Sequence, residues 1–317
     1  MTRYGYSLMC ELHHPNELLA QAKRAEEAGF DFLTISDHIH PWLYSHQHSA
    51  YAWSVLGALA AITTRVDLVS LVTCPTIRYH PVIVAQKAAT IAAMSGGRFH
   101  LGLGAGENLN EHVVGQPWPP AHIRHEMLEE AVEIIRALWS GGYHSYDGKH
   151  FTVYDAKVFT LPDEPPPLHV AASGPASVAL AARSGGGIIT TEPNADLVER
   201  FTEQASSKRP GFGQMAISID DDEQRAKQLA HERFRFAAGG WKVQAELPNP
   251  INFEAATAHV TQDDIAELVP CGPDPERHLE AIRQWTDAGF DHVALAPVAD
   301  TERFFQAWER DLRPRLS

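Results

Sequence analysis

The sequence has few cysteines and no long hydrophobic run, and both shortages restrict what the protein can be. Cys10, Cys74 and Cys271 are the three cysteines among 317 residues, and none of them forms a CxxC pair. Such a set supports neither a disulfide framework nor zinc-finger spacing, so we expect buried free thiols in a reducing cytosol. The absence of an apolar stretch of about 18 residues argues against a membrane span. The N-terminus also lacks the apolar core of a signal peptide, so we expect a cytoplasmic protein.

Positive charge is also scarce. The chain has 26 Lys and Arg against 40 Asp and Glu, a net charge of −14 with its 18 histidines counted neutral. This deficit argues against binding to nucleic acid, which requires a basic face, and against docking on anionic membranes. The imbalance is uneven, with a net charge of −4 in residues 1–160 and −10 in residues 161–317. We therefore expect a small-molecule partner.

A regular alternation of strands and helices runs through the chain. Strands are predicted at 4–9, 31–36, 66–73, 98–104, 168–173, 187–191, 214–219 and 291–296. Helices are predicted at 15–28, 51–62, 82–94, 123–139, 176–183, 195–206, 221–236, 275–288 and 301–312. This order favours right-handed crossovers and a parallel sheet. Eight such units predict an α/β protein with a (β/α)8 (TIM) barrel as a single domain over 1–317, and a doubly wound open sheet is the alternative.

Three further patterns refine this prediction. Residues 26–36 and 286–296 resemble each other, because each has a helix end, a glycine and then a strand. An excursion at about 141–167 contains an Asp-Gly pair that predicts a hairpin, and a second excursion at about 239–261 is irregular or partly helical. Insertions of this length commonly cover an active site, so we expect both over the C-terminal face of the barrel.

Candidate functional residues follow the predicted strands, because the loops there build the active site of a barrel. In SDHIHPW at 36–42, Asp37 and His38 stand where the second strand ends, and histidine is the usual general base near neutral pH. Glu107 lies in GLGAGENLNE, where apolar surroundings would raise its pKa and let it donate a proton or pair with a ligand nitrogen. The glycines there would let the backbone approach a planar ligand or anion, although their spacing is not a dinucleotide fingerprint.

Two further local signals carry alternatives. The segment AASGPAS at 171–177 would present backbone N–H groups and a helix N-terminus to an anion, or form an ordinary tight turn. The histidines at 38, 40, 46 and 48 would allow a metal site and hence a metal-dependent hydrolase. Because they lack a zinc signature such as HExxH, we expect no metal.

Five segments together resemble a known family: SDHIHPW, TCPTIRYHPVIVAQ, GGRFHLGLGAGENLNE, RALWSG and VAASGP. They resemble the luciferase-like flavin and deazaflavin oxidoreductases, and most closely the coenzyme F420-dependent dehydrogenases of the glucose-6-phosphate and secondary-alcohol types. The resemblance covers nearly the whole chain and weakens over 205–260. It implies a barrel that holds the deazaflavin at the carboxyl ends of its strands, and a homodimer.

The resemblance also implies roles for individual residues. His38 would be the catalytic base that takes the hydroxyl proton, and Glu107 the acid partner of the coenzyme ring. Trp42 would pack beside the reacting centre, and Glu11 would line the substrate side. Leu71–Val72 falls where the family often has a non-proline cis peptide bond. The implied cofactor contacts are Asp37, Leu71, Val72, Cys74, Asn110, Ala171, Ala172, Ser173, Gly174 and Thr191.

Two positions depart from the glucose-6-phosphate type. Asn194 and Glu267 stand where those enzymes carry phosphate-binding lysines, and neither residue supplies the positive charge a sugar phosphate needs. We therefore expect a coenzyme F420-dependent dehydrogenase for a neutral secondary alcohol or sugar hydroxyl, running in either direction. The alternatives are an FMN-dependent monooxygenase or flavin reductase, and a catalytically silent flavin-binding protein. The presence of both His38 and Glu107 argues against a silent protein.

Overall fold

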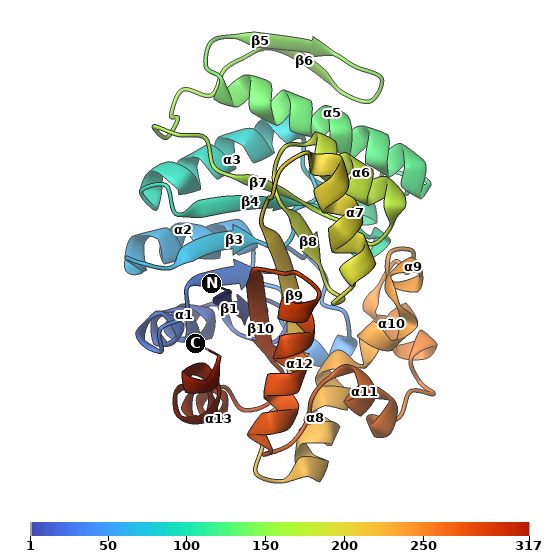
Figure 1. Cartoon of the computed structure of the whole chain (residues 1–317). Coiled ribbons are helices and arrows are strands. Elements are labelled where there is room, and N and C mark those ends of the chain that lie inside the picture. Colours follow the sequence, from blue (N-terminus) through green and yellow to red (C-terminus); the bar gives the residue numbers. More distant parts are fainter. Residues whose placement is uncertain (1, 317) are drawn as a thin grey trace.

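The computed structural model describes residues 2–316 and contains a closed barrel of eight parallel strands (Figure 1). The order around the barrel is β1-β10-β9-β8-β7-β4-β3-β2, and the pairing of β1 with β10 closes the ring and completes the predicted (β/α)8 barrel. The alternative open sheet would leave two unpaired edges, so closure excludes it. The barrel strands are β1 (Arg3–Leu8), β2 (Phe32–Ile35), β3 (Asp67–Ser70), β4 (Phe99–Leu103), β7 (Leu168–Ala171), β8 (Ile188–Thr190), β9 (Gly211–Ile217) and β10 (His292–Pro297).

Helices surround the strands, and all nine predicted helices are present with ends that differ by a few residues. Two short helices that the pattern did not predict are α4 and α11. None of the helices within residues 2–316 is long and apolar enough to cross a membrane. The helices are α1 (Pro15–Glu27), α2 (Ala52–Ile62), α3 (Pro81–Met94), α4 (Asn108–Glu111), α5 (Ala121–Trp139), α6 (Pro175–Arg183), α7 (Ala195–Ala205), α8 (Glu223–Phe234), α9 (Trp241–Gln244), α10 (Pro250–Ala256), α11 (Gln262–Leu268), α12 (Pro275–Asp287) and α13 (Thr301–Ala307).

The resemblance between residues 26–36 and 286–296 has a structural basis. The helices α1 and α12 each end before a glycine, Gly29 with φ +85° and Gly289 with φ +96°. Such positive φ angles favour glycine at a helix C-terminus. The next residues, Phe30 and Phe290, are buried and lead into β2 and β10. The repeated sequence therefore encodes the same helix-to-strand turn twice.

The two insertions occupy different places. The hairpin of β5 (His144–Asp147) and β6 (Thr152–Ala156) lies on the outer side of α5 (Figure 1). Tyr146 Oη donates to Glu133 Oε2 of α5 at 2.8 Å, and the Lys149 backbone N–H donates to Glu130 Oε1 at 2.8 Å. These bonds hold the hairpin beside the barrel, so the prediction that it covers the C-terminal face is wrong. The second insertion, which carries α9 and α10, does contact loops at that face.

The interior of the barrel holds a layer of rings near the amino ends of the strands. The His169 ring lies between those of His100 and Phe212. Its Nε2 is 3.0 Å from His100 Nδ1, and its ring centroid is 4.6 Å from that of Phe212. Phe212 in turn stacks on His292 at 4.3 Å. This layer accounts for three of the histidines that the sequence left unexplained. The opposite, carboxyl ends of the strands carry the polar loops.

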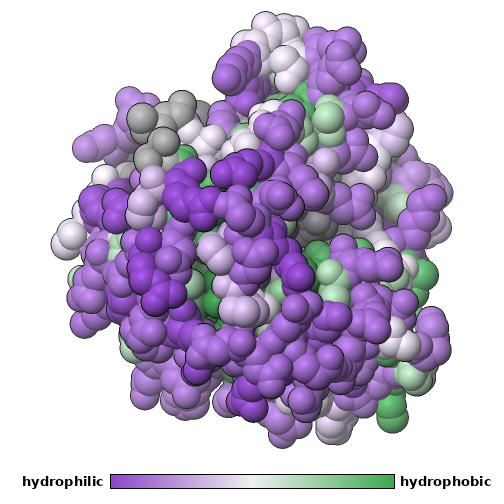
Figure 2. All heavy atoms as spheres, turned by 60° about the horizontal axis from the view of Figure 1, so that its bottom comes forward, coloured by the Kyte–Doolittle hydropathy of each residue, from purple (hydrophilic) through white to green (hydrophobic). Residues whose placement is uncertain are grey.

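The molecular surface agrees with the acidic composition. Figure 2 shows a face that is mostly hydrophilic, on which apolar residues form small separated patches. The apolar side chains are concentrated instead in the barrel wall and beneath the helices.

Candidate active site

Three titratable side chains meet at the carboxyl ends of β1, β2 and β4. Glu11 follows β1, His38 follows β2, and Glu107 follows β4 as the residue that precedes α4. His38 Nδ1 forms an ion pair with Glu11 Oε1, and its Nε2 lies 3.5 Å from Glu107 Oε1. The two carboxylates are 0% and 8% exposed. The structure thus places the imidazole between two buried acids.

This arrangement sets the charge of the His38 imidazole. Burial alone would lower the pKa of His38, but the charge of Glu11, its hydrogen bond and the charge of Glu107 together raise the pKa above its usual value. Burial likewise opposes ionisation of Glu11, yet its contacts with His38 hold the pKa of Glu11 below its usual value. The contacts between the two groups therefore favour the imidazolium form of His38 and the carboxylate form of Glu11. In its neutral form, His38 is a stronger base than an ordinary histidine.

Ser36 orients Glu11. Its Oγ donates to Glu11 Oε2 at 2.8 Å and accepts from the backbone N–H of Cys10 at 3.2 Å. The sequence analysis did not select Ser36, although it stands directly before Asp37 in the SDH motif. Its position directly after β2 is the feature by which the sequence could have identified it as a site residue.

Trp42 connects His38 to the second insertion. The two rings meet edge to face with centroids 4.9 Å apart. On its other side the indole stacks on Phe236 at 4.8 Å and meets Phe253 of α10 at 5.2 Å. The segment that follows α8 therefore packs directly on the residue predicted to lie beside the reacting centre.

Helix α4 also contacts this insertion. The backbone N–H of Asn108 donates to Ala245 O at 2.9 Å, and its side-chain amide donates to Glu246 O at 3.0 Å. Glu246 Oε1 accepts from both terminal nitrogens of Arg124 at 3.2 Å. Since Glu107 directly precedes α4, the insertion holds the loop that carries this acid.

Asp37 is 2% exposed, and its carboxylate serves several internal donors. Its Oδ2 accepts from Trp53 Nε1 at 2.9 Å and from Thr73 Oγ1 at 2.8 Å. Its Oδ1 lies 3.2 Å from Tyr79 Oη and 3.3 Å from Arg78 Nη2. These bonds anchor the loop that carries His38, and contact of Asp37 with a cofactor stays a prediction.

Arg78, which follows β3, links two loops. Its Nη2 donates to Asp37 O at 2.6 Å, and its backbone N–H donates to Glu111 Oε2 at 2.7 Å. Burial raises the pKa of Glu111 to about 7 despite the nearby guanidinium. Burial lowers the pKa of Lys87 to about 7, where its Nζ lies 3.1 Å from the Tyr79 ring centroid. The loops after β2, β3 and β4 therefore share a buried, charged network.

The glycines of GLGAGENLNE pack against the protein itself. A Cβ at Gly102 would lie 2.1 Å from Ser70 O, and one at Gly106 would lie 2.5 Å from Cys74 Sγ. At Gly104 it would lie 2.6 Å from Val72 Cγ2. Glycine is therefore needed at these positions for close internal packing, and the approach of a ligand to this backbone stays a prediction. Leu71–Val72 has the cis peptide bond that the resemblance implied.

The predicted anion cradle is already partly satisfied. The backbone N–H groups of Ser173 and Gly174 both donate to Ser177 Oγ, at 3.1 and 3.2 Å. A ligand would have to displace this hydroxyl to use those amides. Ala171 is half-buried and Ala172 buried, whereas Ser173 and Thr191 are exposed. Their contact with a cofactor stays a prediction.

The additional histidines near His38 do not converge. His40 Nδ1 lies 3.1 Å from Leu109 O, and His46 Nε2 lies 3.1 Å from Arg233 O. Within residues 2–316 no group of three or more His, Cys, Asp or Glu side chains is arranged to hold a metal ion.

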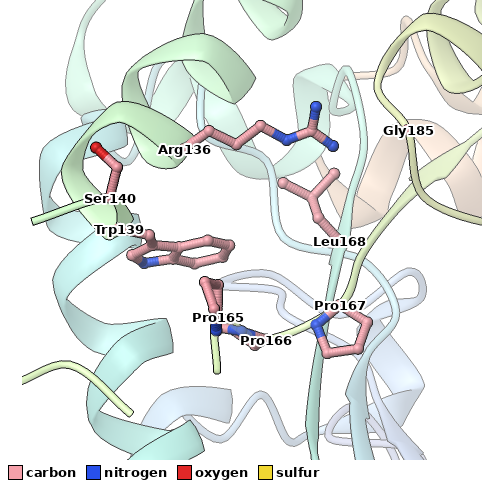
Figure 3. Close-up of a pocket in the computed structure, with 8 residues that line it drawn as sticks. All are labelled: Arg136, Trp139, Ser140, Pro165, Pro166, Pro167, Leu168 and Gly185. Atoms are coloured by element: carbon pink, nitrogen blue, oxygen red, sulfur yellow. The ribbon is translucent and has the colours of Figure 1, made fainter. Parts of the chain in front are cut away.

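A pocket of about 360 Å³ lies at the other end of the barrel (Figure 3). Arg136 and Trp139 near the end of α5 face Pro165 and Pro166 across it, and Leu168 begins β7 beside it. The pocket is therefore at the amino ends of the strands, separate from His38.

The chain was compared with known proteins. The model of the luciferase-like monooxygenase family matches residues 2–292. An F420-dependent glucose-6-phosphate dehydrogenase from Beutenbergia cavernae is 35% identical over 329 aligned residues, which cover 100% of this chain and 98% of that enzyme. An enzyme of the same name from Nakamurella multipartita is 36% identical, with coverage of 99% and 96%.

Solved structures have the same fold. An F420-dependent secondary alcohol dehydrogenase in complex with an F420-acetone adduct superposes with a TM-score of 0.92 at 29% identity, covering 98% of both chains. The coenzyme F420 dependent tetrahydromethanopterin reductase from Methanopyrus kandleri shares the fold with a TM-score of 0.78 at 22% identity. From the match of the family model and from the full-length relatives, the chain belongs to the luciferase-like family.

Proposed function

We propose that the protein is a coenzyme F420-dependent dehydrogenase that oxidises a neutral secondary alcohol or sugar hydroxyl, or reduces the corresponding carbonyl. The observation that carries this proposal is the His38 imidazole held between Glu11 and Glu107 at the carboxyl ends of the strands. Three full-length relatives are each named as an F420-dependent dehydrogenase, which supports the choice of coenzyme.

The apolar residues at the carboxyl ends of β3 and β7 would suit a planar ring. Val72 and Ala171 are half-buried at the barrel mouth, beside the cluster of Leu71 and Ile189. A Cβ at Gly104 would lie 2.6 Å from Val72 Cγ2 and 3.7 Å from Ala171 Cβ, so these residues form one close-packed apolar surface. Such a surface would hold the face of the ring, and Glu107 would face its polar edge. The bound deazaflavin would supply the carbon that accepts or returns a hydride.

His38 provides the acid–base chemistry. Because Nδ1 is paired with Glu11, Nε2 is the ring nitrogen that meets the substrate. During oxidation the substrate O–H bond breaks and its proton moves to Nε2, while hydride leaves the carbinol carbon and the carbonyl double bond forms. The buried Glu11 carboxylate stabilises the imidazolium that results. In the opposite direction, protonated His38 returns the proton to the carbonyl oxygen.

Glu107 is the acid partner of the coenzyme ring in this proposal. It lies at the base of α4, and Asn110 Nδ2 donates to its Oε1 at 2.6 Å. The same oxygen lies 3.5 Å from His38 Nε2. The acid is thus close enough to His38 for the two groups to act on one bound substrate and coenzyme.

The substrate class follows from the two positions where the related sugar-phosphate enzymes carry lysines. Asn194 caps α7, with its Oδ1 accepting from the Leu197 N–H at 3.1 Å. Glu267 is an exposed acid on α11. Neither position offers a cation to a phosphate group, which supports a neutral substrate.

Fluorescence quenching with coenzyme F420 and with FMN tests the coenzyme, and we expect binding of F420. Loss of F420 absorbance with a panel of alcohols, free sugars and sugar phosphates then tests the substrate. We expect neutral alcohols or sugars to react faster than sugar phosphates. Binding of FMN alone would contradict the proposed coenzyme, and a preference for sugar phosphates would contradict the proposed substrate.

A further inference from the structure

We propose that Asn110 is a positioning residue that holds the Glu107 carboxylate opposite Nε2 of His38. The resemblance implies contact with the cofactor, and the hydrogen bonds of Asn110 give it a further role inside the protein. This inference rests on the proposed function, because it concerns the same His38–Glu107 pair. It adds a residue that acts on the reaction through Glu107 and through the loop that carries His38.

Every polar atom of the Asn110 side chain meets a group of the protein. The residue is 0% exposed. Its Nδ2 donates to Glu107 Oε1 at 2.6 Å, and its Oδ1 accepts from the backbone N–H groups of Ile39 at 2.7 Å and His40 at 3.0 Å. A buried amide that bonds at both ends is rigidly held.

These partners require an asparagine in one orientation. If the amide were reversed, its oxygen would face the Glu107 carboxylate and its NH2 group would face two N–H donors. Aspartate would place a second carboxylate against Glu107, and leucine would leave the Ile39 and His40 N–H groups without this acceptor. Asparagine satisfies the donor and the acceptors at the same time.

The bonds of Asn110 reach both members of the catalytic pair. The Glu107 oxygen that accepts from Asn110 is the same Oε1 that lies 3.5 Å from His38 Nε2. The two N–H groups on its other side belong to the residues directly after His38. A single side chain therefore sets the position of the acid relative to the imidazole, from a helix that lies 71 residues beyond Ile39 in the sequence.

The first experiment measures the pKa of His38 by NMR in the protein without coenzyme. The charged groups that face His38 are Glu11, Glu107 and Arg78, and the two carboxylates raise its pKa while Arg78 lowers it. We expect Asn110→Ala and Glu107→Gln each to lower the pKa of His38. In the double variant we expect a decrease smaller than the sum of the two single decreases, because Asn110 acts partly through Glu107. An unchanged pKa in Asn110→Ala, or fully additive decreases, would overturn the proposal.

Asn108→Ala is the matched control. Asn108 lies on the same helix, but its side-chain amide donates to Glu246 O and not to Glu107. We expect this variant to lower the pKa of His38 less than Asn110→Ala does, because its side chain makes no bond to the Glu107 carboxylate. If Asn110→Ala fails to fold, Asn110→Ser replaces it, because serine is smaller and still offers an acceptor toward the Ile39 and His40 N–H groups. We expect the same decrease, since Glu107 would lose its donor at 2.6 Å.

A second experiment separates positioning from cofactor contact. For Asn110→Ala we expect kcat at saturating coenzyme F420 to fall at least about tenfold, because Glu107 loses the bond that positions it, whether or not the Kd for the coenzyme changes. A rise in Kd of about tenfold or more with kcat retained would show cofactor contact and overturn the proposal. If the unmodified protein does not bind F420, the proposed function fails, and the NMR result still decides the role of Asn110.

Discussion

His38 has its two ring nitrogens directed at two different buried acids. Glu11 occupies Nδ1 and raises the basicity of the ring, while Nε2 is directed toward Glu107 and the barrel mouth. Ser36, Asp37 and Asn110 hold the surrounding groups in place. The chemistry thus depends on one imidazole and on the fixed positions of the residues around it.

Removal of the imidazole tests this arrangement most directly. We expect His38→Ala to lower the turnover of the alcohol by roughly 100-fold or more, the usual scale for loss of a general base. Steady-state kinetics measures the loss, and coenzyme binding should persist because the apolar surface at Val72 and Ala171 is unchanged. His122→Ala, on the exposed side of α5, is the control. Near-normal turnover in His38→Ala would mean that this histidine is structural.

The pH dependence of alcohol oxidation and of the reverse carbonyl reduction follows from the raised pKa of His38. Alcohol oxidation requires neutral His38, so its rate should rise with pH through a pKa above the ordinary histidine value of 6.5. Carbonyl reduction requires the imidazolium and should fall through the same pKa. In Glu11→Gln the negative charge is lost, so the rise in oxidation should move to lower pH. A profile of kcat against pH measures this, and an upward shift would contradict the assigned role of Glu11.

At the scale of elements, the turn between β4 and α4 depends on close packing. Gly106 has φ +80°, and a Cβ there would lie 2.5 Å from Cys74 Sγ, whereas Gly115 has φ +79° and no atom within 4 Å of a Cβ. Both Gly→Ala variants carry the same backbone strain, of about 1 kcal/mol. We therefore expect Gly106→Ala to lower the free energy of unfolding more than Gly115→Ala, and to reduce activity by moving Glu107. If chemical denaturation shows that both variants lose the same free energy of unfolding, the steric contact with Cys74 would be contradicted.

The second insertion is held to the barrel by Glu246. This carboxylate accepts from Arg124 at 3.2 Å and from Trp118 Nε1 at 3.0 Å. We expect Glu246→Ala to speed amide hydrogen exchange in α9 and α10, because it removes these bonds. Exchange in β1 and β10 should stay unchanged as the internal control. Equal protection of α9 and α10 in both proteins would show that the Trp42–Phe236 contact and the Asn108 bonds hold the insertion without the Glu246 side chain.

The helices and strands were largely predictable because the sequence features that indicate them involve residues close together in the chain. Apolar periodicity and glycine stops predicted the eight barrel strands and nine helices, and the repeated Gly29 and Gly289 turns support them. The α4 helix was missed because four residues give too little periodicity to recognise. The hairpin was recognised from its Asp-Gly turn, but its location was not, because that depends on the acids of α5 that receive it.

At the scale of the whole molecule, the layer of histidines inside the barrel couples stability to pH. Burial lowers the pKa of His100 to about 4 and also lowers the pKa of His169 well below its usual value. Between about pH 6.5 and pH 4 the unfolded chain binds more protons at His100, so the free energy of unfolding decreases as the pH falls. For His100 alone, this decrease in the free energy of unfolding amounts to as much as about 3 kcal/mol. Asp67, His292 and Arg3 are the charged groups that face it.

The variant His100→Gln tests this coupling. Glutamine keeps a polar contact for His169 and removes one titrating group. We expect urea denaturation between pH 7 and pH 5 to show a smaller decrease of unfolding free energy for the variant than for the unmodified protein. Parallel curves would mean that other groups cause the acid sensitivity.

The predicted homodimer is a separate proposal, and sedimentation analysis would test it.

The sequence by itself determined the order of strands and helices, their parallel arrangement and the chemical types of the catalytic candidates. These follow from short-range periodicity, turn residues and motifs in which the informative residues are neighbours. Tertiary structure alone decided which groups hold those candidates. Ser36, Arg78 and Asn110 act through contacts with residues far away in the chain, such as Asn110 with Ile39, 71 residues apart. Such contacts leave no periodic signal, because they exist only after closure of the barrel brings the ends of different strands together.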